Sequence, residues 1–281
     1  MPDTFDIIFT GTMITALVLI IRRNSRDKEI VGSPAGSNFY NDDVSQETIL
    51  IYKGKELNFS DEIMISVLEK HFPYFNALPE DRKDVFLQRL KKFIALKTFV
   101  IHNKSGFREM PILISATAIK LSMGFEHFTL PHYTHIHIFP EAFLGVYPSL
   151  RVLAGNVSGN RIHISWKHFL EGYQFPEDGQ NVGLHEMAHA YYYQHFETGE
   201  DVEENFVNRF DMFTQIGNAI FEKEKQSADP LYSSYALKNF QEFWAESVEL
   251  FFEKPDTFKS KYTALYYILV NMLNQDPGEM S

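Results

Sequence analysis

The stretch NVGLHEMAHAYYYQHF, residues 181–196, contains two histidines four positions apart, with a glutamate directly after the first. On an α-helix, positions i and i+4 share one face, so His185 and His189 can both reach one metal ion. Imidazole nitrogens bind zinc at about 2.0–2.1 Å. Glu186 would then face the open side of the metal, where it can take a proton from a zinc-bound water. The stretch therefore predicts a helix that carries part of a catalytic zinc site.

The same five-residue pattern also arises by chance on helices that bind no metal. Here the neighbouring residues favour a metal site, because apolar side chains at helical spacing give the predicted helix a buried face. These side chains are Val182, Leu184, Met187, Ala188 and Tyr192. Ionisable residues beside a buried face indicate the wall of a cleft rather than a solvent-exposed helix.

A catalytic zinc site needs a third protein ligand and an open fourth position. The segment NFQEFWAESVELFFEKP, residues 239–255, offers four glutamates on one helical stripe. They are Glu242, Glu246, Glu249 and Glu253. Because the other side chains of this helix are mostly apolar, one or two of the carboxylates should lie in a polar site inside the fold. We expect Glu253 on a solvated face, and the spacing alone leaves both Glu242 and Glu246 open as the ligand.

Composition limits the possible functions. The 281 residues are 44% hydrophobic, which supports a substantial core, and the formal net charge is -11. This acidic balance argues against a nucleic-acid partner, because phosphate binding needs clustered lysine and arginine. The chain has no cysteine. Any metal must therefore be held by histidine, aspartate or glutamate, and the composition fits a reducing compartment.

The N-terminal segment predicts a membrane anchor. Residues 7–21, IIFTGTMITALVLII, carry no charge and are followed at once by RRNSRDK. We expect one hydrophobic helix over residues 5–23 that crosses the membrane, with its flanking arginines reaching the interface. The acidic first residues argue against a cleaved signal peptide. The basic flank places the catalytic domain in the cytoplasm. The expected organisation is an anchor with its basic flank (1–28), a linker (29–46) and a peptidase domain (47–281).

The remaining patterns predict an α+β domain. Apolar and polar residues alternate where we expect strands, and apolar residues recur at helical spacing where we expect helices. Strands are expected over residues 48–59, as two short strands around a Lys-Gly turn, and over 134–143 and 160–169. Helices are expected over residues 78–96, 110–125, 203–222 and 240–252, the last being the final helix of the chain.

Two sequence blocks, GLHEMAHAY and SYALKNFQEFWAESVELFFEKP, resemble the MtfA family, the Mlc titration factor A-like zinc metallopeptidases of the gluzincin group. The resemblance also includes FPYFNALPEDRKDVFLQRLKKFIALKTF, HIHIFPEAF and RIHISWKHFLEGYQFPEDGQNVGLHEMAH, and it covers roughly Phe72 to the C-terminus. It implies an α+β, zincin-like metallopeptidase domain with an HExxH helix and a downstream glutamate helix. In this chain the single N-terminal hydrophobic helix would precede that domain. The implied cofactor is Zn²⁺, and the implied substrate is a peptide or protein.

The resemblance also implies individual roles. It makes His185, His189 and Glu242 the zinc ligands and Glu186 the general base. Tyr235 matches a tyrosine near the metal in this family, where a phenol could donate a hydrogen bond to the oxyanion.

Three further positions extend or limit the resemblance. Glu249 matches a family glutamate that could support a histidine ligand. His163 and Trp166 lie on the strand expected just before the zinc helix, and in gluzincins such a strand can pair with the substrate backbone. After the second histidine this chain reads AYYYQHF, where family members typically read Lys-Leu-Asp, so the family gives no substrate preference.

The sequence thus favours a membrane-tethered zinc peptidase that hydrolyses peptide bonds, with aminopeptidase activity as one form it could take. A first alternative is a regulatory binding protein of the same fold that sequesters a partner, such as a transcriptional regulator. The intact Glu186 speaks partly against this alternative, since a pure binding protein would not need it. A second alternative is a membrane-associated structural domain without a metal.

Overall fold

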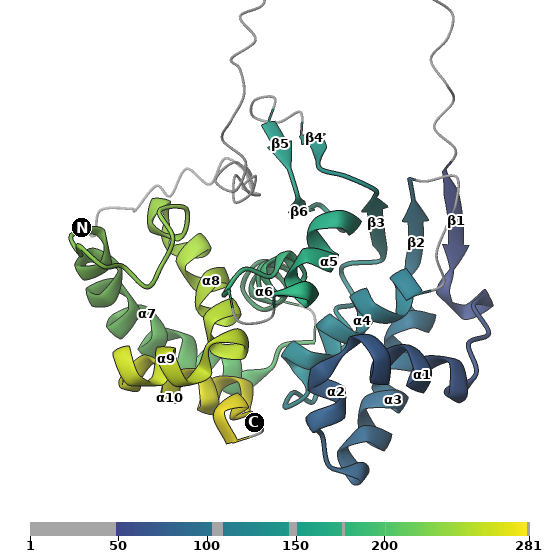
Figure 1. Cartoon of the computed structure of the whole chain (residues 1–281), viewed down its shortest axis with the longest axis horizontal. Coiled ribbons are helices and arrows are strands. Elements are labelled where there is room, and N and C mark those ends of the chain that lie inside the picture. The colour runs from purple at the N-terminus through teal and green to yellow at the C-terminus, as the bar shows by residue number, and fades with distance from the viewer. Residues whose placement is uncertain (1–48, 103–108, 146–150, 176–177, 200, 280–281) are drawn as a thin grey trace, which may run out of the picture.

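The computed structural model of the chain describes residues 49–102, 109–145, 151–175, 178–199 and 201–279. This part is α+β, as predicted, with ten α-helices, a five-stranded mixed sheet and a two-stranded sheet (Figure 1). The expected hydrophobic helix, anchor and linker, residues 1–46, lie outside the described residues. Among the helices of the described ranges, none has the length and apolar content that a membrane crossing requires.

The main sheet has three parallel strands in its centre and one antiparallel strand at each edge. In spatial order the strands are β1 (Leu50–Lys53), β2 (Thr98–Ile101), β3 (His135–Phe139), β7 (Arg161–Ser165) and β6 (Gly155–Ser158). Ile136 and Ile138 of β3 are buried and pair with Ile162 and Ile164 of β7, so one face of the sheet joins the core. The strands β4 (Phe143–Gly145) and β5 (Arg151–Leu153) form a separate antiparallel pair.

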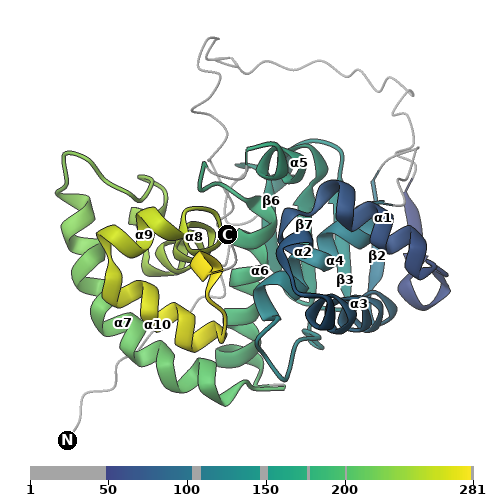
Figure 2. The same ribbon diagram turned by 60° about the horizontal axis from the view of Figure 1, so that its bottom comes forward.

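The helices form two groups on either side of one central helix (Figures 1 and 2). The first group is α1 (Asp61–His71), α2 (Pro73–Ala77), α3 (Glu80–Ala95) and α4 (Glu109–Ser122). Next come α5 (Trp166–Gln174) and the central α6 (Val182–Tyr193). The second group is α7 (Glu204–Lys225), α8 (Phe240–Glu253), α9 (Pro255–Lys261) and α10 (Thr263–Leu273). Short helical turns span Gly54–Glu56, Gln194–Thr198, Ala236–Lys238 and Pro277–Glu279.

The central helix α6 is buried along almost its whole length, because small residues allow its neighbours to approach closely. A Cβ at Gly183 would lie 2.7 Å from the ring of Phe169, which only glycine avoids. On another side, the Trp244 indole of α8 donates a hydrogen bond of 3.0 Å to the Ala188 carbonyl. The Trp244 ring packs edge-on against aromatic rings of α7, which fixes α8 from behind.

The predicted helices over 78–96, 110–125, 203–222 and 240–252 are confirmed as α3, α4, α7 and α8, with small differences at their ends. The predicted strand over 134–143 is confirmed in its centre as β3. Three other expectations are corrected.

The second strand of the expected pair over 48–59 does not form. The Gly54 amide donates a hydrogen bond to the Lys97 carbonyl, and a Cβ at Gly54 would lie 1.7 Å from the Ile94 carbonyl oxygen. The chain therefore turns tightly against the end of α3 at this glycine instead of folding back as a hairpin, and β1 pairs with β2.

The strand expected over 160–169 ends at Ser165, because Trp166 begins α5. Trp166, Phe169 and Tyr173 recur at helical spacing along one face of α5. The Phe169 ring stacks on that of Trp166 and contacts that of Tyr173 at a tilt. The helix over 240–252 is also not the last. Pro255, whose fixed φ suits a first helical turn, starts α9, and the apolar α10 follows.

The indole hydrogen bond between α8 and α6 gives a test of this packing. We expect Trp244→Phe to lower the free energy of unfolding by about 1–3 kcal/mol, through the lost hydrogen bond and the cavity that the smaller ring leaves. Urea denaturation followed by circular dichroism measures the change. The chain's other tryptophan is the control: Trp166 is only partly buried. If Trp244→Phe and Trp166→Phe lower the free energy of unfolding equally, the contact between α6 and α8 is no more important for stability than that of a partly buried tryptophan.

Candidate metal centre

Two helices bring the candidate ligands together. His185 and His189 lie one turn apart on the face of α6 that packs against α8, and Glu242 lies in the first turn of α8. Both helices begin with an asparagine whose side chain accepts hydrogen bonds from amides of the first turn, Asn181 for α6 and Asn239 for α8. These caps fix where each helix starts, and therefore which side chains face the contact.

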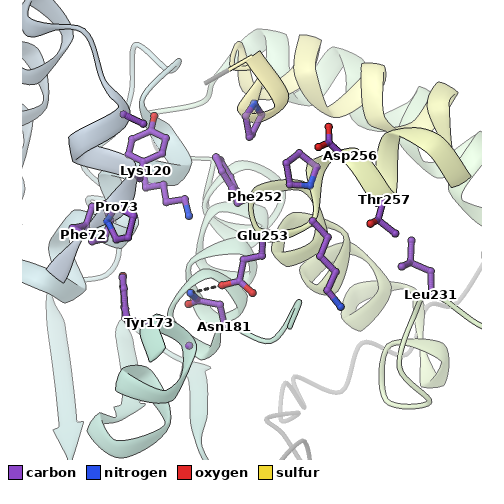
Figure 3. Close-up of a pocket in the computed structure, with 16 residues that line it drawn as sticks. Phe72, Pro73, Lys120, Tyr173, Asn181, Leu231, Phe252, Glu253, Asp256 and Thr257 are labelled. Atoms are coloured by element: carbon purple, nitrogen blue, oxygen red, sulfur yellow. Dashed lines mark hydrogen bonds between the residues drawn. The ribbon is translucent and has the colours of Figure 1, made fainter. Parts of the chain in front are cut away.

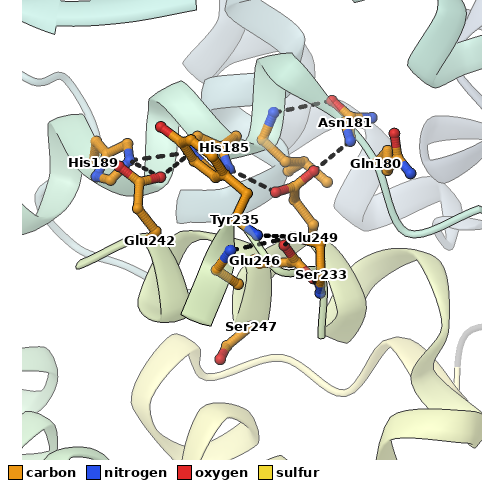
Figure 4. A network of polar contacts seen from close by, with 12 residues as sticks. Gln180, Asn181, His185, His189, Ser233, Tyr235, Glu242, Glu246, Ser247 and Glu249 are labelled. Atoms are coloured by element: carbon orange, nitrogen blue, oxygen red, sulfur yellow. Dashed lines mark hydrogen bonds and ion pairs between the residues drawn. The ribbon is translucent and has the colours of Figure 1, made fainter. Parts of the chain in front are cut away.

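The three side chains point their terminal atoms at one another (Figure 4). His185 Nε2 lies 3.0 Å from Glu242 Oε2 and 3.2 Å from His189 Nε2, and His189 Nε2 lies 3.5 Å from Glu242 Oε2. Around a tetrahedral zinc with bonds of about 2.0–2.1 Å, ligand atoms lie about 3.3 Å apart. Among the described residues, no other cluster of His, Asp or Glu side chains has three or more potential ligand atoms this close. The donor set and its spacing therefore fit zinc.

The charges around this cluster also suit a cation. Burial by itself lowers the pKa of His185, but the carboxylates of Glu249 and Glu242 outweigh burial and raise that pKa well above its usual range. Burial by itself raises the pKa of Glu242, but His189 and His185 outweigh it and lower the pKa to about 2. The carboxylates beside His185 thus favour positive charge at this imidazole, and a bound metal ion would supply such a charge.

Glu249 orients one of the candidate ligands. His185 Nδ1 donates a hydrogen bond of 2.6 Å to Glu249 Oε1, so Nε2 is the nitrogen left to bind a metal. The second oxygen of Glu249 accepts a hydrogen bond of 2.5 Å from the Asn181 amide. The carboxylate is fully buried and is held between the histidine and the start of the same helix.

Glu186 lies beside the cluster with a carboxylate that the described residues leave without a hydrogen bond. It is 1% exposed, and burial raises its pKa to about 8. The edge strand β6 passes directly over it: a Cβ at Gly155 would lie 2.4 Å from Glu186 Oε1. Only a glycine allows the backbone this close to the carboxylate.

Tyr235 lies next to the cluster, with its ring centroid 6.3 Å from that of His185. Burial raises the pKa of its hydroxyl well above the usual range, and the carboxylates of Glu242 and Glu186 raise it further. The phenol therefore stays protonated at neutral pH and can act as a hydrogen-bond donor.

The turn that presents Tyr235 is held by Glu246. The Glu246 carboxylate accepts hydrogen bonds from the Ser233 amide (2.6 Å) and from the Ser233 hydroxyl (2.5 Å). The Ser233 hydroxyl oxygen in turn accepts the amides of Tyr235 and Ala236, both at 3.2 Å. Glu246 is therefore engaged with this turn, and the structure brings Glu242 rather than Glu246 to the histidines.

Two expectations about neighbouring residues are wrong. Glu253 does not lie on a solvated face: it is 8% exposed and accepts a hydrogen bond of 2.8 Å from the Asn181 side chain. His163 lies on β7, which is paired on both sides by β3 and β6, and Trp166 lies on α5, so neither is on a free strand edge. The edge strand beside α6 is β6. Gly155 was not among the predicted site residues, although a glycine inside a short strand often signals a close backbone approach.

The chain also matches a known protein family. The family model described as glucose-regulated metallo-peptidase M90 matches residues 53–273. The chain belongs to this family. This is the MtfA family that the sequence blocks resemble, so that expectation is confirmed. Membership gives the chain a metallopeptidase-type function and a peptide or protein as its substrate. No curated protein matches the chain.

The close approach of β6 to Glu186 predicts that Gly155→Ala lowers peptide cleavage. The new Cβ must displace the carboxylate, and a displacement of about 1 Å near reacting atoms can cost about 100-fold in rate. Turnover of a mixed peptide library, with metal content measured in parallel, tests this. Ser158→Ala on the same strand is the control. A Gly155→Ala protein that keeps full activity would show that the position of Glu186 under β6 is unimportant.

The hydrogen bond from His185 to Glu249 predicts that Glu249→Gln weakens metal binding by about 10–100-fold, since the amide orients the imidazole less well. Competition with a chromophoric chelator measures the affinity. Glu253→Gln is the matched control, one turn further along α8 and in contact with Asn181 but with neither histidine. Equal affinities for the wild type and Glu249→Gln would contradict the supporting role.

Proposed function

We propose that this chain is a zinc-dependent peptidase that hydrolyses peptide bonds with water. In this proposal His185, His189 and Glu242 hold the metal, and Glu186 is the general base. One observation carries it: three buried ligand atoms lie at the spacing of a tetrahedral site, 3.0–3.5 Å apart, directly beside a carboxylate that the described residues leave without a hydrogen bond.

The residues divide the chemistry between them. A zinc ion held here would supply a Lewis acid for the peptide carbonyl and would acidify water. Glu186 accepts the proton of the attacking water and passes it to the amide nitrogen as the C–N bond breaks, which leaves a free amine. Burial raises the pKa of this carboxyl group, which favours uptake of the proton from the water.

Tyr235 completes the proposed site. Its protonated hydroxyl donates a hydrogen bond to the carbonyl oxygen as negative charge develops there. The Glu246–Ser233 contacts support this role, because they hold the turn that carries Tyr235.

An extended substrate would lie along β6. Among the described residues this strand pairs only with β7, and Gly155 at its start lies over Glu186. A peptide that adds to the free edge of β6 by backbone hydrogen bonds would pass the general base. The substrate-pairing strand is thus β6, in place of the strand with His163 that the sequence suggested.

The location of the protein is a separate proposal that rests on the sequence alone. We propose that residues 5–23 tether the chain to a membrane with the catalytic domain in the cytoplasm. Aminopeptidase activity likewise stays a prediction. No feature of the described residues favours partner sequestration over hydrolysis.

The proposal predicts that Glu186→Gln lowers kcat by about 10²–10⁴-fold while zinc per chain stays unchanged, because Glu186 moves a proton and binds no metal. Removal of metal by a chelator should abolish activity, and added zinc should restore it. A mixed peptide library and elemental analysis provide the readouts, and Glu222→Gln, an exposed change on α7, is the control. An active Glu186→Gln protein, or undiminished activity after metal removal, would contradict the proposal.

A further inference from the structure

A cavity lies apart from the candidate metal centre. It has a volume of about 670 Å³ and opens between α2, α4 and α5 on one side and the junction of α8 and α9 on the other (Figure 3). This volume lies within the range of small-molecule sites, about 300–1,000 Å³. None of the candidate metal ligands lines it. Asn181 lies between the metal centre and the cavity. Its backbone amide donates a hydrogen bond to Glu249, and its side chain donates one to Glu253.

Four aromatic side chains line part of this cavity. Phe72 and Tyr74 come from the α1–α2 region, Tyr173 from α5, and Phe252 from the end of α8. Aromatic walls of this kind suit an apolar side chain, which gains free energy when it leaves water.

The charged residues that line the cavity are Lys120, Glu253, Lys254 and Asp256, of which Asp256 is exposed. Two of them, Glu253 and Lys120, face the cavity without a hydrogen bond or ion pair between them. Glu253 is more than nine-tenths buried, and its Oε2 has no hydrogen-bond partner among the described residues. The Lys120 ammonium lies 5.0 Å from the Phe252 ring centroid and 5.6 Å from that of Tyr74. Within the described ranges, no hydrogen bond or ion pair joins Lys120 to a carboxylate, Glu253 included.

Such charges are costly to bury unless an opposite charge reaches them. Burial raises the pKa of the Glu253 carboxyl group and lowers that of the Lys120 ammonium, and each charge only partly offsets the burial of the other. A molecule that brings an ammonium group to Glu253 and a carboxylate to Lys120 would satisfy both. A small zwitterion has these two groups.

We propose that this cavity binds a short peptide with free termini. Its ammonium terminus pairs with Glu253 Oε2, its carboxylate terminus pairs with Lys120 Nζ, and an apolar side chain packs on the aromatic wall. A dipeptide or tripeptide fits the volume. The site is distinct from the metal centre, and its existence does not depend on the proposed peptidase reaction.

Calorimetric titration with glycyl-phenylalanine tests the proposal. The protein is the full chain with Glu186→Gln, so that the dipeptide is not hydrolysed during the experiment. We expect saturable binding of one dipeptide per chain. The N-acetylated dipeptide and the dipeptide amide each lack one terminal charge, so each should bind at least about tenfold more weakly.

Substitutions locate the site. Lys120→Met and Glu253→Gln should each weaken binding at least about tenfold. Lys92→Met is the matched control, since the Lys92 ammonium also lies over an aromatic ring, that of Phe128 at 5.4 Å, but outside the cavity. The Lys92→Met protein should bind glycyl-phenylalanine as tightly as the parent protein does. Circular dichroism of each variant confirms folding, and Lys120→Met and Glu253→Gln test the site independently of each other.

Metal removal separates this site from the catalytic one. Binding should survive chelator treatment and the His189→Ala substitution. Loss of binding after either change would place the dipeptide at the metal centre and overturn the proposal. The proposal is also overturned if glycyl-phenylalanine does not bind at concentrations up to about 10 mM. It is likewise overturned if the Lys120→Met and Glu253→Gln proteins both bind the dipeptide as well as the parent protein does. Neither result would bear on the catalytic roles of Glu186 and the histidines.

Discussion

The burial of one acidic stripe is the constraint on which the rest of this structure depends. Helix α8 carries four glutamates, and all four lie inside the fold. An unpaired buried carboxylate is costly, so each one must find compensation nearby. Glu242 finds it at the two histidines, and Glu249 at His185 and the Asn181 amide. Glu246 finds it at Ser233, and Glu253 finds part of it at the Asn181 side chain, which reaches only one of its two oxygens. The four glutamates thus connect α8 to α6 and to the turn that carries Ser233 and Tyr235, which precedes α8.

These contacts also explain how the residues of a catalytic site are preorganised. The first carboxylate joins the imidazoles, the second secures the turn with Tyr235, and the third fixes the tautomer of His185. The aromatic packing of α7 against Trp244 supports the same helix from behind. A site whose ligands and supporting contacts come from two packed helices needs little rearrangement to bind a metal ion or to act on a substrate.

Much of this arrangement was predictable, because helical spacing is a local property of the sequence. The pair His185 and His189, the glutamate stripe and the long helices all follow from the 3.6-residue period. The choice between Glu242 and Glu246 does not, because it depends on which turn of α8 meets α6. The burial of Glu253 was missed for a similar reason, since its partner Asn181 lies 72 residues away in the chain.

Sheet order was equally hidden, because β6 precedes β7 in the chain yet forms the edge beside α6. That order, and with it the role of Gly155 over Glu186, appears only once the strands are paired.

Zinc affinity in two matched variants of α8 tests the central claim most directly. Glu242 and Glu246 lie one helical turn apart, and both are buried, but only Glu242 reaches the histidines. The account predicts that Glu242→Gln weakens zinc binding at least about 100-fold, more than loss of a supporting residue would. Glu246→Gln should bind zinc like the wild type. If Glu246→Gln loses zinc and Glu242→Gln keeps it, the assignment of the metal centre is wrong.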